Sequence, residues 1–216
     1  MIELYTAATP NGWKISILLE ELGLEYEMFP INLSSEEQKT PKFLAMNPNG
    51  KIPVIKDTQN DQVIFESGAI MIYLAEKTGR LMPKTHRYEI LQWLMFQVGG
   101  IGPMMGQANV FVRYFPEKIP AVIDRYQNEV KRLFKVMDKH LSTRDYLAGD
   151  YSIADIANWS WVHIAYWPKI DLQEFTNLNA WVERIASRAP VQKGINIPKK
   201  PDAEAIKKAG QKIIKS

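Results

Sequence analysis

The chain contains no cysteine among its 216 residues. A disulfide scaffold and a cysteine-ligated metal site are therefore excluded, as is any mechanism that needs a thiol of the protein itself. If the protein carries out sulfur chemistry, the sulfur must come from a bound small molecule. We expect no metal in its site.

An excess of charge of one sign is also lacking. The 27 basic and 24 acidic side chains leave a net charge of +3, which is too small to predict binding to nucleic acid or to a membrane surface. Charged residues interrupt every apolar run, and the N-terminus has no basic stretch followed by an apolar one. We therefore expect a cytoplasmic protein with no membrane segment and no nucleic-acid partner.

What is present divides into two parts. The first part mixes short strand-like runs with helical spacing, in the order β-α-β-α-β-β-α. From Arg87 onward the pattern is helical throughout, and the glycines before Pro103 are expected to bend or break one helix. We expect an α+β protein with a mixed domain, a linker, an all-helical domain and a basic tail that forms a surface helix or frays. The expected limits of these four parts are residues 1–79, 80–86, 87–198 and 199–216.

Four segments carry a resemblance to a known family. They are residues 49–55 (NGKIPVI), 65–70 (FESGAI), 99–107 (GGIGPMMGQ) and 151–159 (YSIADIANW). In this order the chain resembles the glutathione transferases. The third segment and residues 9–12 (TPNG) are similar to the nu class, which is related to the fungal nitrogen-regulator branch and includes bacterial glutathione-dependent disulfide-bond oxidoreductases. The resemblance implies a thioredoxin-like N-terminal domain, an all-helical C-terminal domain, and glutathione as co-substrate.

Glu66 and Ser67 are expected to bind the γ-glutamyl end of glutathione. Ser67 begins a predicted helix, where unpaired backbone N–H groups and the helix dipole favour an anion. Its hydroxyl and N–H suit the γ-glutamyl carboxylate, while the Glu66 carboxylate suits the ammonium. A plain helix cap is the simpler alternative, and it is compatible with binding.

The loop before the third predicted strand is expected to bind the rest of the tripeptide. The resemblance implies that Pro53 is a cis proline, and that Ile52 pairs its N–H and C=O with the backbone of glutathione as an added strand would. Lys51 and Gln38 are expected to hold the glycine carboxylate and its neighbours. Gln38 has the alternative of a solvated loop residue.

Thr9 and Asn11 are the predicted catalytic residues. In thiol-disulfide members of the fold, the same place carries Cys-Pro-x-Cys, and here Thr9 and Gly12 replace both cysteines. The Thr9 hydroxyl, the Asn11 amide and the helix N-terminus can each donate to the sulfur of glutathione. Charge-assisted bonds of about 1.5–3 kcal/mol each suffice to lower a thiol pKa by roughly two units from about 8.5. Tyr5, a possible alternative hydroxyl, is expected to serve packing.

The helical domain is expected to supply the second-substrate pocket and one further contact. Arg125 would reach glutathione across a dimer interface, with a surface ion pair to Asp124 or Glu129 as the alternative. For the pocket, core packing is an equal alternative at each position. The expected pocket residues are Met104, Met105, Gln107 and Phe111.

Ser152 and Asp155 are assigned a structural role. Ser, two residues, then Asp before an apolar run is typical of a capping box, in which the acid reaches back to the N–H of the cap residue. His163, in an aromatic cluster nearby, is expected to be a core histidine rather than a catalyst.

The predicted activity is reduction of small disulfides by bound glutathione thiolate in a homodimer, with transferase or peroxidase side activity. One alternative is conjugation of glutathione to electrophiles as the main activity. Another is a glutathione-binding regulatory module without turnover, and a third is a transferase fold used only for assembly. The absence of cysteine fits each of them.

Overall fold

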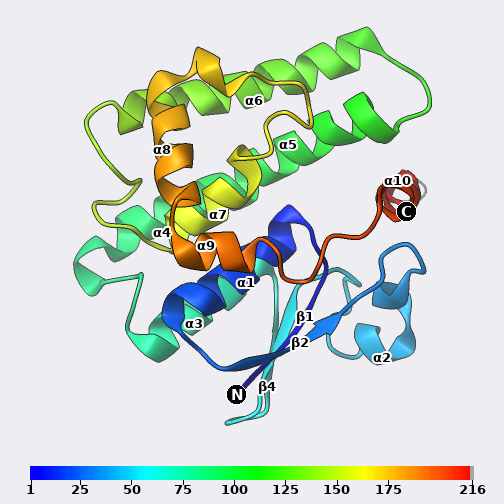
Figure 1. Cartoon of the computed structure of the whole chain (residues 1–216), viewed down its shortest axis with the longest axis vertical. Helices are drawn as coiled ribbons and strands as arrows, with labels where there is room; N and C mark the ends of the chain where they lie inside the picture. The colour runs from blue at the N-terminus through cyan, green and yellow to red at the C-terminus, as the bar shows by residue number, and fades with distance from the viewer. Residues whose placement is uncertain (215–216) are drawn as a thin grey trace. The chain divides into compact units, whose positions relative to one another are not determined.

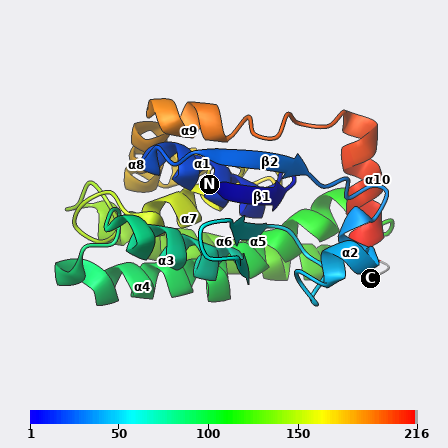
Figure 2. The ribbon, with the colours of Figure 1, turned by 90° about the horizontal axis from the view of Figure 1, so that it is seen from below.

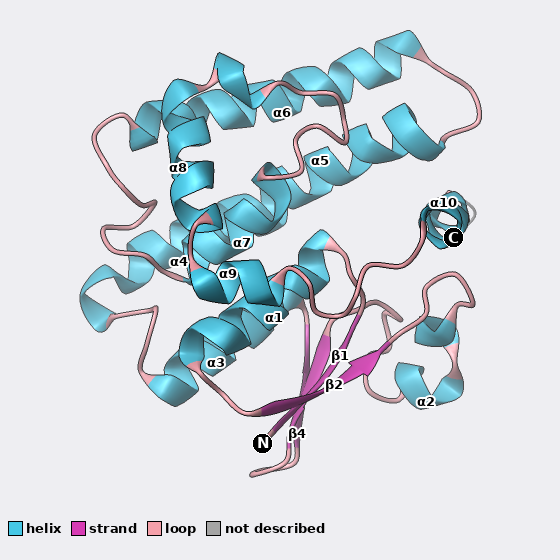
Figure 3. Cartoon of the chain, in the orientation of Figure 1, coloured by secondary structure: helices cyan, strands magenta, loops and turns pink. Residues whose placement is uncertain are grey.

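The computed structural model describes residues 1–214, which form two compact units (Figure 1). The first comprises Met1–Arg80 with Arg188–Ala209, and the second comprises Leu81–Ser187 with the end of the chain from Gly210. Every strand of the described part lies in the first unit, and the second is helical (Figure 3). The predicted α+β class is confirmed.

The first unit is built on a four-stranded mixed sheet in the order β2-β1-β3-β4. Its strands are β1 (Ile2–Thr6), β2 (Tyr26–Pro30), β3 (Val54–Asp57) and β4 (Gln62–Phe65). β1 runs parallel to β2 and antiparallel to β3, and β3 pairs antiparallel with β4. Side chains alternate along β1, so Ile2 and Leu4 are buried whereas Glu3 and Tyr5 are half-buried.

Helices α1 (Pro10–Leu22) and α3 (Ser67–Thr78) pack against each other in this unit (Figure 1). The side chain of Thr9 caps the N-terminus of α1, and Gly23, which follows its last residue, has the left-handed conformation typical of a helix C-terminus. A short helix that the sequence pattern did not predict, α9 (Ala189–Gly194), lies along α1 (Figure 2). The remaining pieces are the 3-10 turn η1 (Glu37–Lys39) and α2 (Pro41–Leu44).

The second unit packs its helices around a core that includes Val130, Phe134 and Trp181. Within it, α5 and α6 run side by side (Figure 1), and α4 packs on α7. The tail forms α10, as one of the two expected outcomes, and residues 203–209 of this helix belong to the first unit. The bounds are η2 (Lys84–His86), α4 (Arg87–Phe96), α5 (Gly102–Asn109), α6 (Pro120–Leu141), α7 (Ile153–Val162), η5 (Leu172–Glu174), α8 (Thr176–Ala186) and α10 (Ala203–Ile213).

The helix expected to bend or break before Pro103 is interrupted there by a change of helix type. The chain stays helical there, but it widens into π turns at η3 (Gln97–Ile101) and again at η4 (Val110–Tyr114). A proline lacks the N–H for the α pattern and crowds the carbonyl four residues earlier, and a π turn accommodates both effects. A Cβ on Gly102 would lie 2.6 Å from Gln97 Nε2, so a larger residue there would have to displace the Gln97 side chain.

The predicted capping box is present at the start of α7. The Asp155 carboxylate accepts a bond from the Ser152 backbone N–H at 3.0 Å, and the Ser152 hydroxyl oxygen accepts one from the Ala154 N–H at 3.2 Å. Asp155 also accepts bonds from the Leu147 N–H and from the indole N–H of Trp181, both at 3.0 Å. One buried carboxylate therefore ties together the loop before α7, its cap and α8.

No helix of the part of the chain that the structure describes is long and apolar enough to cross a membrane.

Candidate functional site

The predicted catalytic residues lie in the first turn of α1. Thr9 has an extended backbone as the N-cap residue, and its hydroxyl oxygen accepts a bond from the Gly12 N–H at 3.3 Å. Accepting this bond leaves the hydroxyl hydrogen as a donor, because a threonine hydroxyl has one donor and two acceptor positions. Asn11 is half-buried in the first turn, next to the positive end of the helix dipole. This turn can therefore direct several donors at one anion.

Gly12 has no room for a side chain. A Cβ at this position would overlap the carbonyl oxygen of Ala7 and would lie 2.5 Å from Thr6 Oγ1. The resemblance places the second cysteine of a dithiol motif at this position. The loop geometry of this chain therefore excludes that cysteine sterically, in addition to its absence from the sequence.

Glu66 and Ser67 form the turn between β4 and α3. Glu66 has a φ of 69°, an unusual conformation for a residue other than glycine, and its side chain does not cap α3. Its carboxylate is exposed, whereas Ser67, the first residue of α3, is buried. No acidic side chain lies in the first turn of α3. The N-terminus of α3 therefore offers donors to an anion, with one carboxylate beside it.

The loop before β3 is held in place by Asn47. Its buried amide donates to the Lys51 carbonyl at 2.7 Å, and its side-chain oxygen accepts a bond from the Asn49 N–H. The Ile52–Pro53 peptide is cis, as the resemblance implies. Lys51 is exposed and Ile52 is half-buried. The loop thus presents Lys51 and Ile52 from a fixed backbone.

Gln38 lies in η1, close to the same loop. A Cβ on Gly50 would lie 3.0 Å from the Gln38 carbonyl oxygen and 3.0 Å from Lys39 Nζ. The side-chain oxygen of Gln38 is buried and has no hydrogen-bond partner in the structure. Because a buried acceptor without a partner is costly, this atom suits an N–H donor of a ligand.

Strand pairing brings these loops to one end of the sheet. Tyr5 is opposite Val54, and Val54 is opposite Phe65, so the end of β1, the start of β3 and the end of β4 coincide. Thr6 is paired with Pro30 in the parallel direction, so the chain also leaves β2 at this end. The segments around Thr9, Gln38, Lys51 and Glu66 therefore emerge from the same end of the sheet, where the predicted glutathione site lies.

Tyr5 does not compete for the role of thiol activator. Burial, a hydrogen bond to the Glu3 carboxylate at 2.8 Å and the negative charge of Glu3 together raise the pKa of Tyr5 to about 12. Its ring stacks on Phe29 at a centroid distance of 4.8 Å. The phenol keeps its proton and directs it to Glu3, which agrees with the expected packing role.

In the helical unit, three of the four expected pocket residues share a face. Met104, Gln107 and Phe111 are spaced three and four residues apart and are half-buried or exposed. Met105 is 1% exposed and belongs to the core, which is the alternative given for each of these positions. Phe111 stacks on Tyr126 at 5.6 Å, which fixes its ring.

Arg125 projects from α6 as an exposed side chain. Its guanidinium lies 3.7 Å from the carboxylate of the half-buried Glu129, and this i,i+4 pair contributes little to stability because the arginine is exposed to solvent. The pair is one of the two predicted alternatives, and it leaves the arginine exposed to solvent.

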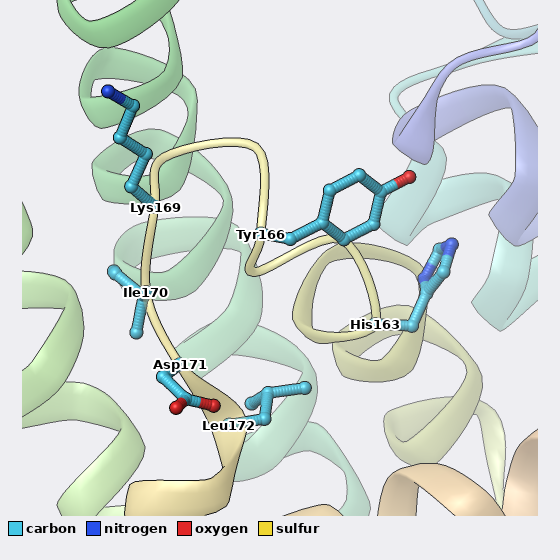
Figure 4. A pocket seen from close by; sticks show the side chains of 6 residues that line it. All are labelled: His163, Tyr166, Lys169, Ile170, Asp171 and Leu172. Carbon is cyan, nitrogen blue, oxygen red and sulfur yellow. The ribbon is translucent and has the colours of Figure 1, made fainter.

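A cavity of about 390 Å³ opens elsewhere in the helical unit (Figure 4). The hydroxyl of Tyr166 and the ammonium of Lys169 point away from each other (Figure 4). His163 stacks on Trp159 at 4.1 Å, and its Nδ1 lies 2.8 Å from the Trp159 carbonyl oxygen. The polar groups of this cavity do not converge on a common point, so we assign it no chemistry. Its lining residues are His163, Tyr166, Lys169, Ile170, Asp171 and Leu172.

Two residues near this end of the sheet were not among the site residues expected from the sequence. Asn47 positions the loop that carries Lys51, and its only signal in the sequence is a turn. Lys14 of α1 contacts Ser67, and nothing in the local pattern distinguishes it from a surface lysine. Within residues 1–214, no three His, Asp or Glu side chains are grouped as ligands for a metal ion.

Family models match both parts of the chain. The model of the glutathione S-transferase N-terminal domain matches residues 1–76, and that of the C-terminal domain matches residues 88–189. The chain belongs to the glutathione S-transferase family. The resemblance seen in the four sequence segments is confirmed.

Three relatives of this transferase are informative. The disulfide-bond oxidoreductase YfcG of Escherichia coli is 46% identical over 196 residues, which are 87% of this chain and 91% of YfcG. A glutathione transferase from Burkholderia graminis, solved with two glutathione molecules per subunit, has a TM-score of 0.88 at 42% identity, covering 93% of this chain and 89% of its own. One from Pseudomonas putida, solved with one glutathione disulfide per subunit, has a TM-score of 0.85 at 41% identity and 91% coverage of each chain.

Proposed function

We propose that this glutathione transferase reduces small disulfides with bound glutathione. The observation that carries the proposal is the first turn of α1 in a chain without cysteine: Thr9 and Gly12 stand where a dithiol would lie, and Thr9 and Asn11 offer polar donors there. The related structures solved with two glutathione molecules or with glutathione disulfide support a site that accommodates both partners of a thiol–disulfide exchange.

In the proposed reaction, glutathione lies across the loops at this end of the sheet. Ser67 and Glu66 bind its γ-glutamyl end, and Ile52, after Pro53, pairs with its backbone. Gln38 and Lys51 bind the glycine end. This arrangement directs the cysteinyl sulfur at Thr9 and Asn11, whose donors stabilise the thiolate and lower its pKa.

The exchange then proceeds in two steps. The bound thiolate attacks one sulfur of the substrate disulfide, forms a mixed disulfide and expels the other sulfur as a thiolate, which takes a proton from water. A second glutathione thiolate attacks the glutathione sulfur of the mixed disulfide. The products are two thiols and one glutathione disulfide, so the two electrons come from two glutathione molecules.

The proposal includes a cytoplasmic homodimer. The edge strand β4 exposes the apolar side chains of Val63 and Phe65, and α4 exposes Tyr88 and Met95. A homodimer that covers these side chains would remove their apolar surface from water. In such a dimer, Arg125 of the partner subunit would contact glutathione. Met104, Gln107 and Phe111 would line the pocket for the second substrate.

The decisive experiment measures turnover with purified protein, glutathione and a small symmetrical disulfide. We expect glutathione disulfide to form at a rate that falls at least tenfold in Asn11→Ala. Asn196→Ala, which removes an exposed asparagine side chain after α9, is the matched control and should retain activity. Equally fast cleavage of the disulfide without added glutathione would contradict the mechanism. Faster turnover with an aromatic halide than with the disulfide would favour conjugation.

A further inference from the structure

Lys14 is buried beside a predicted glutathione ligand. The residue is 2% exposed, and its ammonium donates to the Ser67 hydroxyl oxygen at 3.1 Å across the α1–α3 contact. Burial lowers the pKa of Lys14 to about 7, although the negative charge of Glu66 raises it. Lysine is rarely buried to this extent without a role for its charge.

The contact determines what Ser67 can do. A serine hydroxyl has one hydrogen to donate and two acceptor positions, whereas an ammonium donates only. In its protonated form, Lys14 therefore occupies an acceptor position of Ser67 and cannot receive its hydrogen. A ligand carboxylate next to the amine favours this form, because an opposite charge raises the pKa of a lysine. The hydroxyl hydrogen must point to a different acceptor, so Ser67 is set as a donor.

The local charges favour an anion as that acceptor. The Lys14 ammonium lies at the N-terminus of α3, where the helix dipole is also positive and the first turn has no acidic side chain. Glu66 provides one carboxylate, and it is exposed. A carboxylate of the ligand beside Ser67 would add a second negative charge next to the ammonium.

We propose that Lys14 is a positioning residue that sets Ser67 as the donor to the α-carboxylate of the γ-glutamyl group. This inference rests on the proposed glutathione site. Lys14 acts through Ser67 and through its charge, and it makes no contact with the reacting sulfur. It would therefore determine selectivity for γ-glutamyl peptides over peptides that lack this carboxylate.

The test compares two ligands by calorimetry. One is glutathione, and the other is 4-aminobutyryl-cysteinyl-glycine, which lacks only the γ-glutamyl α-carboxylate. We expect Lys14→Met to weaken glutathione binding about 10- to 100-fold, and to weaken binding of the analogue less than about threefold. Lys51→Met is the matched control, because both ligands keep the glycine carboxylate and should lose affinity equally.

The outcomes separate this inference from the proposed function. If the unmodified protein does not bind glutathione at millimolar concentration, both fail. If it binds and Lys14→Met weakens both ligands equally, the Lys14 role fails alone, since a structural defect does not distinguish the ligands. Should Lys14→Met not fold, as judged by circular dichroism, Lys14→Gln, which keeps a polar side chain without the charge, is measured instead with the same two ligands. A loss confined to glutathione supports the inference, and an unchanged affinity overturns it.

Discussion

The indole N–H of Trp181 donates to the Asp155 carboxylate at 3.0 Å, so two buried side chains 26 residues apart share one hydrogen bond. The same carboxylate also accepts the Leu147 N–H. Asp155→Ala would leave both buried donors without a partner, besides opening the capping box. We expect a loss of about 2–5 kcal/mol in unfolding free energy, measured by denaturant titration.

Ser152→Ala is the control for that experiment. It removes the cap and the bond that the Ser152 hydroxyl donates to the Asp155 carboxylate at 3.1 Å, but it leaves the Leu147 and Trp181 donors paired, and it should cost about 1 kcal/mol. Equal losses in the two variants would show that the bonds outside the box contribute nothing.

Asp57 makes the stability of the fold depend on pH in the acid range. Burial raises the pKa of Asp57, but bonds from Lys77 at 2.7 Å, Tyr73 at 2.6 Å and the Gln59 N–H outweigh burial and hold the pKa at about 2. Because the folded pKa lies below the ordinary value of 3.8, this stabilisation is present above pH 4 and is lost as the pH falls toward 2.

Lys77→Met should therefore melt at a lower temperature than the unmodified protein at pH 7, by about 2–4 °C, and the difference should shrink below pH 3. The control is Lys56→Met, whose partner Asp61 is an exposed carboxylate 3.2 Å away. We expect no pH-dependent difference for that variant. A Lys77→Met deficit that stays constant down to pH 2 would refute the assignment.

Gly12 should tolerate no side chain. Gly12→Ala places a Cβ against the Ala7 carbonyl oxygen, and we expect a loss of at least about 2 kcal/mol in stability. Gly99→Ala is the matched control, since a Cβ there meets nothing within 4 Å, and this variant should be neutral or more stable. Thermal melts of the two proteins decide, and similar melting temperatures would contradict the packing argument.

Asn11→Asp tests the thiolate stabilisation directly. The substitution keeps the shape of the side chain and replaces a donor amide by a negative charge, which disfavours a nearby sulfur anion. We expect the pKa of bound glutathione, followed by the ultraviolet absorbance of the thiolate, to rise by one unit or more. Glutathione affinity at pH 6, where the thiol is protonated, should change little. An unshifted titration would remove Asn11 from the mechanism.

Mixed dimers test whether Arg125 acts on the neighbouring site. In a heterodimer of Asn11→Ala and Arg125→Ala subunits, action across the interface leaves one site with both residues intact and the other with neither. Action within one subunit leaves a defect in every site. We expect activity to recover on mixing to about half per heterodimer, and a mixture no more active than its two parents would rule out the crossed arrangement.

Several elements could be predicted because their signals are local. The capping box of Ser152 and Asp155 follows from a fixed spacing before an apolar run, and Thr9-Pro10 marks the start of α1 through cap and proline chemistry. Glu66 and Ser67 could be assigned because the family motif places them at the start of a helix. The loops at one edge of the sheet follow from the strand order that the family implies.

Other features depend on contacts that no local pattern contains. Lys14 meets Ser67 53 residues away, and its burial results from the packing of α1 on α3. Met105 and Met104 are neighbours in sequence, and only the rotation of α5 decides that Met105 faces the core. α9 was missed because its six residues, which include a proline and end in glycine, are too few to show a helical period in the sequence.

The crowding at Gly12 also limits how the protein can change over evolutionary time. A cysteine in place of Thr9 is one substitution away and would yield a single thiol. A second cysteine in place of Gly12 would in addition require moving the Thr6–Ala7 backbone that fills the space beside the glycine. The path to an enzyme with its own redox pair therefore passes through an unstable intermediate, and under the proposed mechanism a chain with this loop depends on soluble thiols.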